Sequence, residues 1–286
     1  MPYEIMGPTP RPHLSFSQLK VAAQCGEEYR LKYVEGLAQE QENLPAVVGT
    51  AMHAAVEEFE SRYDLQGDID LPPQRKMDLW VDLTTRTKNA LHHYMDSNNL
   101  EAGDLLVYGG DTMRKFQTDL IPKMTEAYLE QRWAEIESGF EWAVKGSGAL
   151  SSEIECLIDI GGVELLAYVD QLFLDSMGRH VIRDLKTGKP RPGHAMQLEF
   201  YHYALFLKTG IKCDYGQLLY VKGGKLYVQV VKFSLQPDDI LRMIRRLLAQ
   251  IGDNSFTING PFTDHCKICS VRSNCVYGNV GVHGSS

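Results

Sequence analysis

The chain has 286 residues, of which 44% are hydrophobic and 23% charged, as is usual for a soluble globular protein. No apolar run is long enough to cross a bilayer, and residues 1–12 lack the basic-then-apolar pattern of a signal peptide, so we expect a cytoplasmic protein without membrane contact. The net charge of −8 disfavours nucleic-acid binding, yet residues 179–250 carry 13 Lys and Arg against 5 Asp and Glu. This basic segment could hold DNA, although on charge alone a chance cluster of solvated side chains is the better explanation.

The first half of the chain is expected to be helical. Serine N-caps, apolar residues at helical spacing, and Gly or Pro at the boundaries indicate four helices. They are expected at residues 15–34, 46–63, 74–98 and 112–138.

The second half is expected to form a mixed sheet with two further helices. Gly161-Gly162 and Gly223-Gly224 are typical of hairpin turns between β-rich segments. Strands are expected at 153–160, 163–175, 179–187, 215–222 and 225–233, and helices at 197–208 and 237–252. No linker is visible, so we expect a single α/β domain over residues 1–286.

Two aspartates and a lysine form a candidate metal site. The period of two along a strand places Asp184 and Lys186 on one face. If residues 176–178 form a three-residue loop, Asp175 pairs with Arg179, and counting back five places Asp170 opposite Asp184. Opposite Cβ atoms lie roughly 5 Å apart, which lets both carboxylates share one Mg²⁺ or Mn²⁺.

This arrangement suits hydrolysis of a phosphodiester bond. A divalent metal lowers the pKa of bound water and neutralises charge in the transition state, while Lys186 orients the water or stabilises that charge. A D-x-K triplet alone is far more often a surface ion pair, so the pattern is informative only in combination.

Three other residues extend the combination. His53 lies beside the apolar face of its expected helix, and imidazole is a good ligand for Mn²⁺, although a lone helical histidine is usually a packing residue. Gln197 and Tyr201 are one helical turn apart, directly after the Asp184–Lys186 strand, and can point together toward its end. An ordinary pair on a helix surface has the same spacing.

Taken in order, these residues resemble the RecB-type branch of the PD-(D/E)XK nuclease superfamily. The pattern is Gly49-x-x-x-His53, Asp170, Asp184-x-Lys186-Thr187-Gly188 and Gln197-x-x-x-Tyr201. The resemblance implies a restriction-endonuclease-like α/β core with a helical insertion at about 65–150. It also implies metal ligation by His53, Asp170, Asp184 and the Leu185 carbonyl, catalysis by Lys186, and DNA contacts or site organisation by Gln197 and Tyr201. Asp184 stands where many relatives carry Glu.

Three of the six cysteines lie within ten residues, in the pattern Cys266-x-x-Cys269-x5-Cys275, which points to metal binding in a cytosolic chain. Cys25 is the best candidate for a fourth ligand. Cys156 and Cys213 are expected to pack as small apolar residues. On chemistry alone, four cysteines suit Zn²⁺ and an iron–sulfur cluster equally well.

The motif around Cys25 resembles that of AddB-type and CRISPR-associated four-cysteine nucleases. It runs from Leu14-Ser15-Phe16-Ser17-Gln18-Leu19 through Cys25 to Tyr29 and Tyr33, although Gly26 follows Cys25 where most relatives carry proline. This resemblance implies a 4Fe–4S cluster held by Cys25, Cys266, Cys269 and Cys275, which would join the region 261–278 to the N-terminal helix. Its expected role is structural.

The expected function is metal-dependent hydrolysis of DNA, most plausibly by an exonuclease in recombination, repair or phage DNA processing. The expected partners are DNA, either single-stranded or duplex with an end, and recombination or replication proteins. Two rivals remain: a non-catalytic DNA-binding or adaptor subunit that keeps the fold and the cluster, and a zinc-containing binding module.

Overall fold

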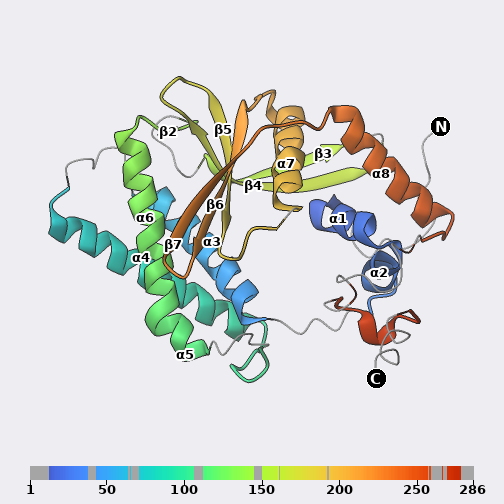
Figure 1. Ribbon diagram of the computed structural model, residues 1–286, viewed down its shortest axis with the longest axis horizontal. Helices are drawn as coiled ribbons and strands as arrows, with labels where there is room; N and C mark the ends of the chain where they lie inside the picture. Colours follow the sequence, from blue (N-terminus) through green and yellow to red (C-terminus); the bar gives the residue numbers. More distant parts are fainter. Residues whose placement is uncertain are drawn as a thin grey trace, which may run out of the picture. The chain divides into compact units, whose positions relative to one another are not determined.

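The computed structural model describes residues 13–37, 43–63, 65, 71–105, 112–144, 150–160, 162–191, 193–256, 258, 266 and 269–277 (Figure 1). The chain divides into two compact units. The core unit consists of Gln41–Glu155 and Tyr168–Phe233. The terminal unit consists of Met1–Glu40, Cys156–Ala167 and Ser234–Ser286, and it therefore holds both ends of the chain.

The core unit is built on a mixed β-sheet. Strand β4 pairs antiparallel with β5, β5 pairs parallel with β6, and β6 pairs antiparallel with β7, while β2 and β3 also pair with β4. The bounds are β2 Glu141–Trp142, β3 Ser152–Asp159, β4 Glu164–Leu174, β5 His180–Lys186, β6 Tyr215–Lys222 and β7 Lys225–Val231. The expected strands are confirmed. The short β2 was not expected, because two residues are too few to show a strand pattern.

The hairpin between β4 and β5 has the expected register. The Asp175 N–H donates to the Arg179 carbonyl at 3.0 Å, and Gly178 has a φ of 72°, the left-handed conformation that glycine adopts without strain. Regular pairing then runs from Leu174–His180 to Gln171–Arg183. One residue further along, Asp170 is level with Asp184, as the counting predicted.

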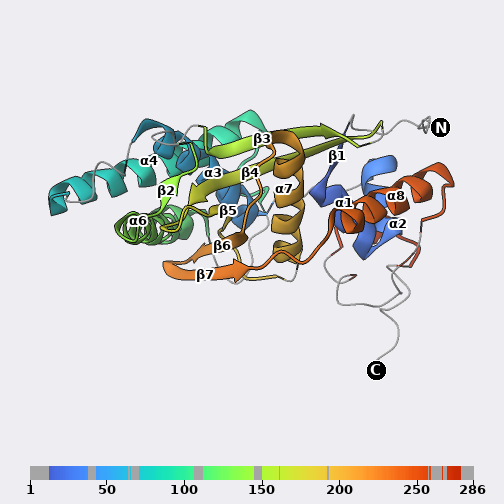
Figure 2. The ribbon, with the colours of Figure 1, turned by 90° about the horizontal axis from the view of Figure 1, so that it is seen from above.

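Helices cover both faces of this sheet in the core unit. Helices α3 (Leu44–Arg62), α4 (Pro73–Ser97) and α6 (Ile121–Glu137) lie on one face, and α7 (Gly193–Thr209) packs against β5 and β6 on the other (Figure 2). Helix α6 is preceded by the short α5 (Met113–Lys115) and a π-helical turn, Phe116–Leu120, within the single helix expected over 112–138. Among the described residues, no helix is both long and apolar enough to span a membrane.

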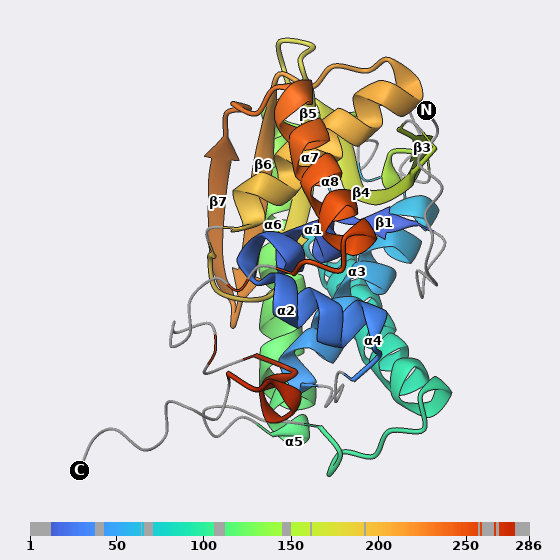
Figure 3. The ribbon, with the colours of Figure 1, turned by 90° about the vertical axis from the view of Figure 1, so that its right-hand side faces the viewer.

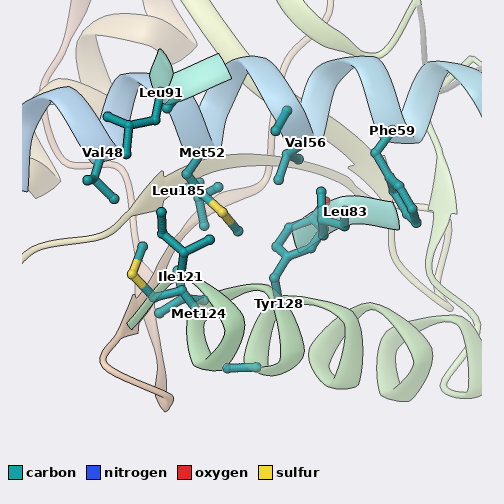
Figure 4. Close-up of a cluster of buried hydrophobic side chains, with 14 of the residues drawn as sticks. Val48, Met52, Val56, Phe59, Leu83, Leu91, Ile121, Met124, Tyr128 and Leu185 are labelled. Carbon is teal, nitrogen blue, oxygen red and sulfur yellow. The ribbon is translucent and has the colours of Figure 1, made fainter. Parts of the chain in front are cut away.

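The main hydrophobic cluster lies between α3, α4, α6 and the sheet. Met52 of α3, Leu83 of α4, Tyr128 of α6 and Leu185 of β5 are each at most 2% exposed, and Figure 4 shows their side chains meeting. Burial of this much apolar surface fixes α3 against the strand that carries Asp184 and Lys186.

The terminal unit contains β1 (Leu14–Ser15), α1 (Phe16–Gln24), α2 (Gly26–Tyr29) and α8 (Pro237–Gly252), with α8 beside α1 (Figure 3). Strand β1 pairs in parallel with β4 at Leu165 and Leu166. The Ser15 hydroxyl caps α1 by accepting a hydrogen bond from the Gln18 N–H at 3.4 Å.

The single helix expected over residues 15–34 is wrong. Cys25 has an extended backbone, with φ −159° and ψ 113°, and separates α1 from α2, which continues into a π-helical turn at Arg30–Val34. Gly26 follows Cys25, and glycine in a helix costs roughly 1 kcal/mol relative to alanine. A continuous helix would therefore be weakest at this junction.

Candidate metal and catalytic site

One side of the site is formed by His53, Glu153 and Asp170, each of which offers an atom within 4.8 Å of the others. His53 Nδ1 lies 3.2 Å from Asp170 Oδ2 and 3.7 Å from Glu153 Oε1. The other ring nitrogen, Nε2, lies 2.8 Å from the carbonyl oxygen of Leu185. The structure therefore places His53, Asp170 and the Leu185 carbonyl together, as the sequence pattern predicts.

The other side is a chain of polar contacts that links β5 to α7. Lys186 Nζ lies 2.5 Å from Asp184 Oδ2 and donates to Gln197 Oε1 at 3.0 Å. The amide of Gln197 in turn donates to the Tyr201 hydroxyl at 2.6 Å. The expectation that Gln197 and Tyr201 point together toward the end of this strand is confirmed.

The close approach of α3 to β5 explains why a glycine precedes His53 by one helical turn. A Cβ atom on Gly49 would lie 2.9 Å from Thr187 Oγ1, inside normal contact distance. Without that Cβ, α3 passes near the end of β5, and His53 reaches the Leu185 carbonyl. Asp170 Oδ2 reinforces this end by accepting the Leu185 N–H at 2.8 Å, so the carboxylate takes the place of a strand partner.

Burial and neighbouring charges shift the pKa values of the site residues. Burial raises the pKa of Asp170 to about 7, although the nearby His53 opposes that rise, and burial also raises the pKa of Asp184 against the pull of Lys186. Burial disfavours the charged form of His53, but Asp170, Glu153 and Asp184 outweigh it and raise its pKa to about 9. Asp170 and Asp184 are 8% and 1% exposed. Such crowded, buried carboxylates are relieved by a cation between them.

Glu153 is the site residue that the sequence analysis missed. It is the second residue of β3, and its φ of 46° lies in the left-handed region, which costs a non-glycine residue roughly 1–3 kcal/mol. Backbone strain of this size is common where a side chain is aimed at a functional site. No signal in the sequence could have revealed it, because two other acidic residues, Glu155 and Asp159, lie in the same strand.

The donor set fits a hard divalent cation. Carboxylate oxygens, a backbone carbonyl and one imidazole are the ligands preferred by Mg²⁺ and Mn²⁺. A cavity of about 10 Å³, roughly the room of one water molecule, lies among His53, Glu57, Glu153, Asp170 and Leu185. The residues can therefore hold a metal ion beside the Asp184–Lys186 pair.

A buried ionic network holds the same strands from the opposite face of the sheet. Arg183 of β5, fully buried, contacts Glu135 of α6 and donates to Gln217 at 2.7 Å. Gln171 of β4 donates to the Tyr128 hydroxyl at 2.7 Å. Because Gln171 and Arg183 adjoin Asp170 and Asp184 in sequence, this network fixes the two strands that carry the site.

In the terminal unit Cys25 interacts electrostatically with Cys269, but among the described residues no three of the candidate cluster cysteines have ligand atoms within 4.8 Å of one another. Burial, followed by Glu28 and Cys25 as neighbouring acids, raises the pKa of Cys269 to about 11. Cys275 lies near Arg30 at the end of a short helical turn, Arg272–Asn274, and Asn274 donates to the Leu37 carbonyl at 2.8 Å. No disulfide joins any of the six cysteines, and Cys156 and Cys213 are buried as expected.

Comparison with known proteins places this chain in a family. No curated protein matches the chain, whereas 18 chains of solved structure do. Among these is the crystal structure of SSO0001, which shares 19% identity over 55% of this chain and 69% of its own, with a TM-score of 0.33. The sequence model of the PD-(D/E)XK nuclease superfamily matches residues 13–276. The chain belongs to the PD-(D/E)XK nuclease superfamily.

Proposed function

We propose that this protein is a Mg²⁺- or Mn²⁺-dependent DNA exonuclease whose metal is held by His53, Glu153, Asp170, Asp184 and the Leu185 carbonyl. The observation that carries the proposal is the gathering of the His53, Glu153 and Asp170 ligand atoms within 4.8 Å, beside a strand end that presents Asp184 and Lys186. Superfamily membership implies a nuclease hydrolase that acts with a divalent metal.

In this proposal a divalent cation, when bound, would lower the pKa of a water molecule and neutralise charge on the phosphate. The chain's own residues position the reacting groups. Lys186, held between Asp184 and Gln197, donates a hydrogen bond to the attacking water or to a phosphate oxygen. Burial and the two aspartates raise the pKa of Tyr201, so its hydroxyl stays neutral and keeps Gln197 in place.

The exonuclease mode is tested by comparing linear and circular substrates. With Mn²⁺ or Mg²⁺, the wild-type protein should degrade end-labelled linear DNA and leave a closed circle of the same sequence intact. Equal cleavage of both forms would instead identify an endonuclease. No cleavage of either form under both metals would contradict the nuclease proposal and favour a DNA-binding subunit.

We further propose that Cys25, Cys266, Cys269 and Cys275 hold a 4Fe–4S cluster. The electrostatic interaction of Cys25 with Cys269 in the terminal unit supports a shared ligand site, in which a bound metal would hold both as thiolates. The preference for iron over zinc rests on the resemblance of the Cys25 motif. Elemental analysis of anaerobically purified protein tests it: about four iron and four sulfide per chain support the cluster, and about one zinc contradicts it.

A further inference from the structure

A row of aromatic rings leads away from the candidate site along the face of the sheet that α7 covers. Lys186 of β5 is level with Tyr220 of β6, which is level with Tyr227 of β7. The rings of Tyr220 and Tyr227 stack with centroids 5.8 Å apart and planes at 29°. Tyr220 also stacks with His194, with ring centroids 5.8 Å apart and planes at 28°, and His194 Nδ1 lies 3.0 Å from the Tyr220 hydroxyl.

Solvent exposure differs between the two tyrosine rings. Tyr220 is 3% exposed, whereas Tyr227 on the edge strand is 53% exposed. With neighbouring strands about 4.8 Å apart, the Tyr227 backbone lies about 10 Å from that of Lys186. Tyr220, which His194 contacts in turn, packs against the Tyr227 ring. Tyr227 is therefore a half-exposed ring supported by Tyr220, two strands away from Lys186.

Two lysines flank the ring on the same face. Lys222 of β6 and Lys225 of β7 are exposed and directly opposite each other, each two residues from its tyrosine. Like charges in opposite positions destabilise a hairpin unless an anion lies between them. No ion pair found among the described residues involves either lysine. Two cations beside a half-exposed aromatic ring match a phosphate backbone that carries unpaired bases.

We infer that Tyr227, supported by Tyr220 and His194 and flanked by Lys222 and Lys225, is a base-stacking platform that feeds single-stranded DNA to the site at Lys186. A duplex buries the faces of its bases in its own stack, so only an unpaired strand can lay a base on this ring. The inference rests on the proposed nuclease function and narrows its substrate to single-stranded DNA.

The test is binding of single-stranded oligonucleotides that carry 2-aminopurine, measured by fluorescence in EDTA, so that hydrolysis does not interfere. Tyr227→Ala should bind about tenfold more weakly and lose the quenching of the stacked base, while Tyr227→Phe should behave like the wild type. Phe206→Ala, which removes another exposed aromatic ring of the core unit (42% exposed), is the matched control and should change nothing. Replacing both Lys222 and Lys225 with Ala should lower the slope of log Kd against log salt by about 1.4.

Wild-type binding by Tyr227→Ala, or an equal loss on single strands and blunt duplexes, would overturn the inference. Cleavage of the same oligonucleotides with Mn²⁺ reports on the proposed function separately. If the wild type cleaves and Tyr227→Ala binds normally, only the platform is wrong. If the wild type binds in a Tyr227-dependent way but does not cleave, the platform stands and the nuclease proposal fails.

Discussion

At the scale of single residues, the site binds protons that a metal must displace. The pKa of Asp170 is raised to about 7 and that of His53 to about 9, so near neutral pH in the metal-free protein His53 is largely protonated and Asp170 is about half protonated. Metal ligands must be deprotonated, so the apparent affinity for Mn²⁺ should rise as pH increases from about 6 to about 8. Isothermal titration in two buffers of different ionisation enthalpy should show proton release on binding. An affinity that falls over this range would contradict the assignment.

Glu153 gives a second prediction at this scale. Glu153→Gln keeps the size of the side chain but removes a charged ligand, and should weaken Mn²⁺ binding by about tenfold or more. Glu155→Gln, two residues along the same strand, alters a carboxylate that faces the Tyr168 hydroxyl instead, and should leave Mn²⁺ affinity unchanged. Equal affinities in the two variants would remove Glu153 from the ligand set.

At the scale of elements, the buried network on the opposite face should stabilise the pairing of β4 with β5. Arg183→Met removes a fully buried cation and leaves Glu135 and Gln217 without that partner, which should lower the free energy of unfolding by about 3 kcal/mol. Arg179→Met, on the same hairpin, removes a half-exposed cation paired with Asp175 and should lower the free energy of unfolding far less. Urea denaturation of both variants measures the difference, and similar losses would show that the network is not the stronger support.

The elements also show what local sequence can predict. The register of Asp170 and Asp184 was predictable, because Gly178 fixes the loop and the period of two fixes the face. Gln197 and Tyr201 were predictable from helical spacing. Glu153 was not, because its role depends on a positive φ and on how β3 pairs with β4, both of which tertiary contacts decide. The break at Cys25 was missed for a related reason, since helical periodicity continues through it.

At the scale of the whole molecule, the cysteine site should tie the two ends of the chain together. Cys25→Ser should abolish the broad absorption near about 400 nm of anaerobically prepared protein and lower its thermal stability, because the unfolded chain cannot preform the ligand set. Cys156→Ser and Cys213→Ser replace buried cysteines outside the set and should keep the colour. A colourless wild type, or full colour in Cys25→Ser, would contradict the cluster proposal.

The central claim is that the protein hydrolyses DNA and that Lys186 takes part in the reaction. The most direct test is the single-turnover rate of hydrolysis of end-labelled DNA at saturating Mn²⁺, measured for the wild type, Lys186→Met and the matched control Lys189→Met. Lys186→Met should fold and bind Mn²⁺, yet cleave about a hundredfold to a thousandfold more slowly, because one preorganised donor to the reacting phosphate or water is lost. Lys189→Met, which changes an exposed lysine just beyond β5, should cleave at the wild-type rate. Near-normal cleavage by Lys186→Met would contradict the account.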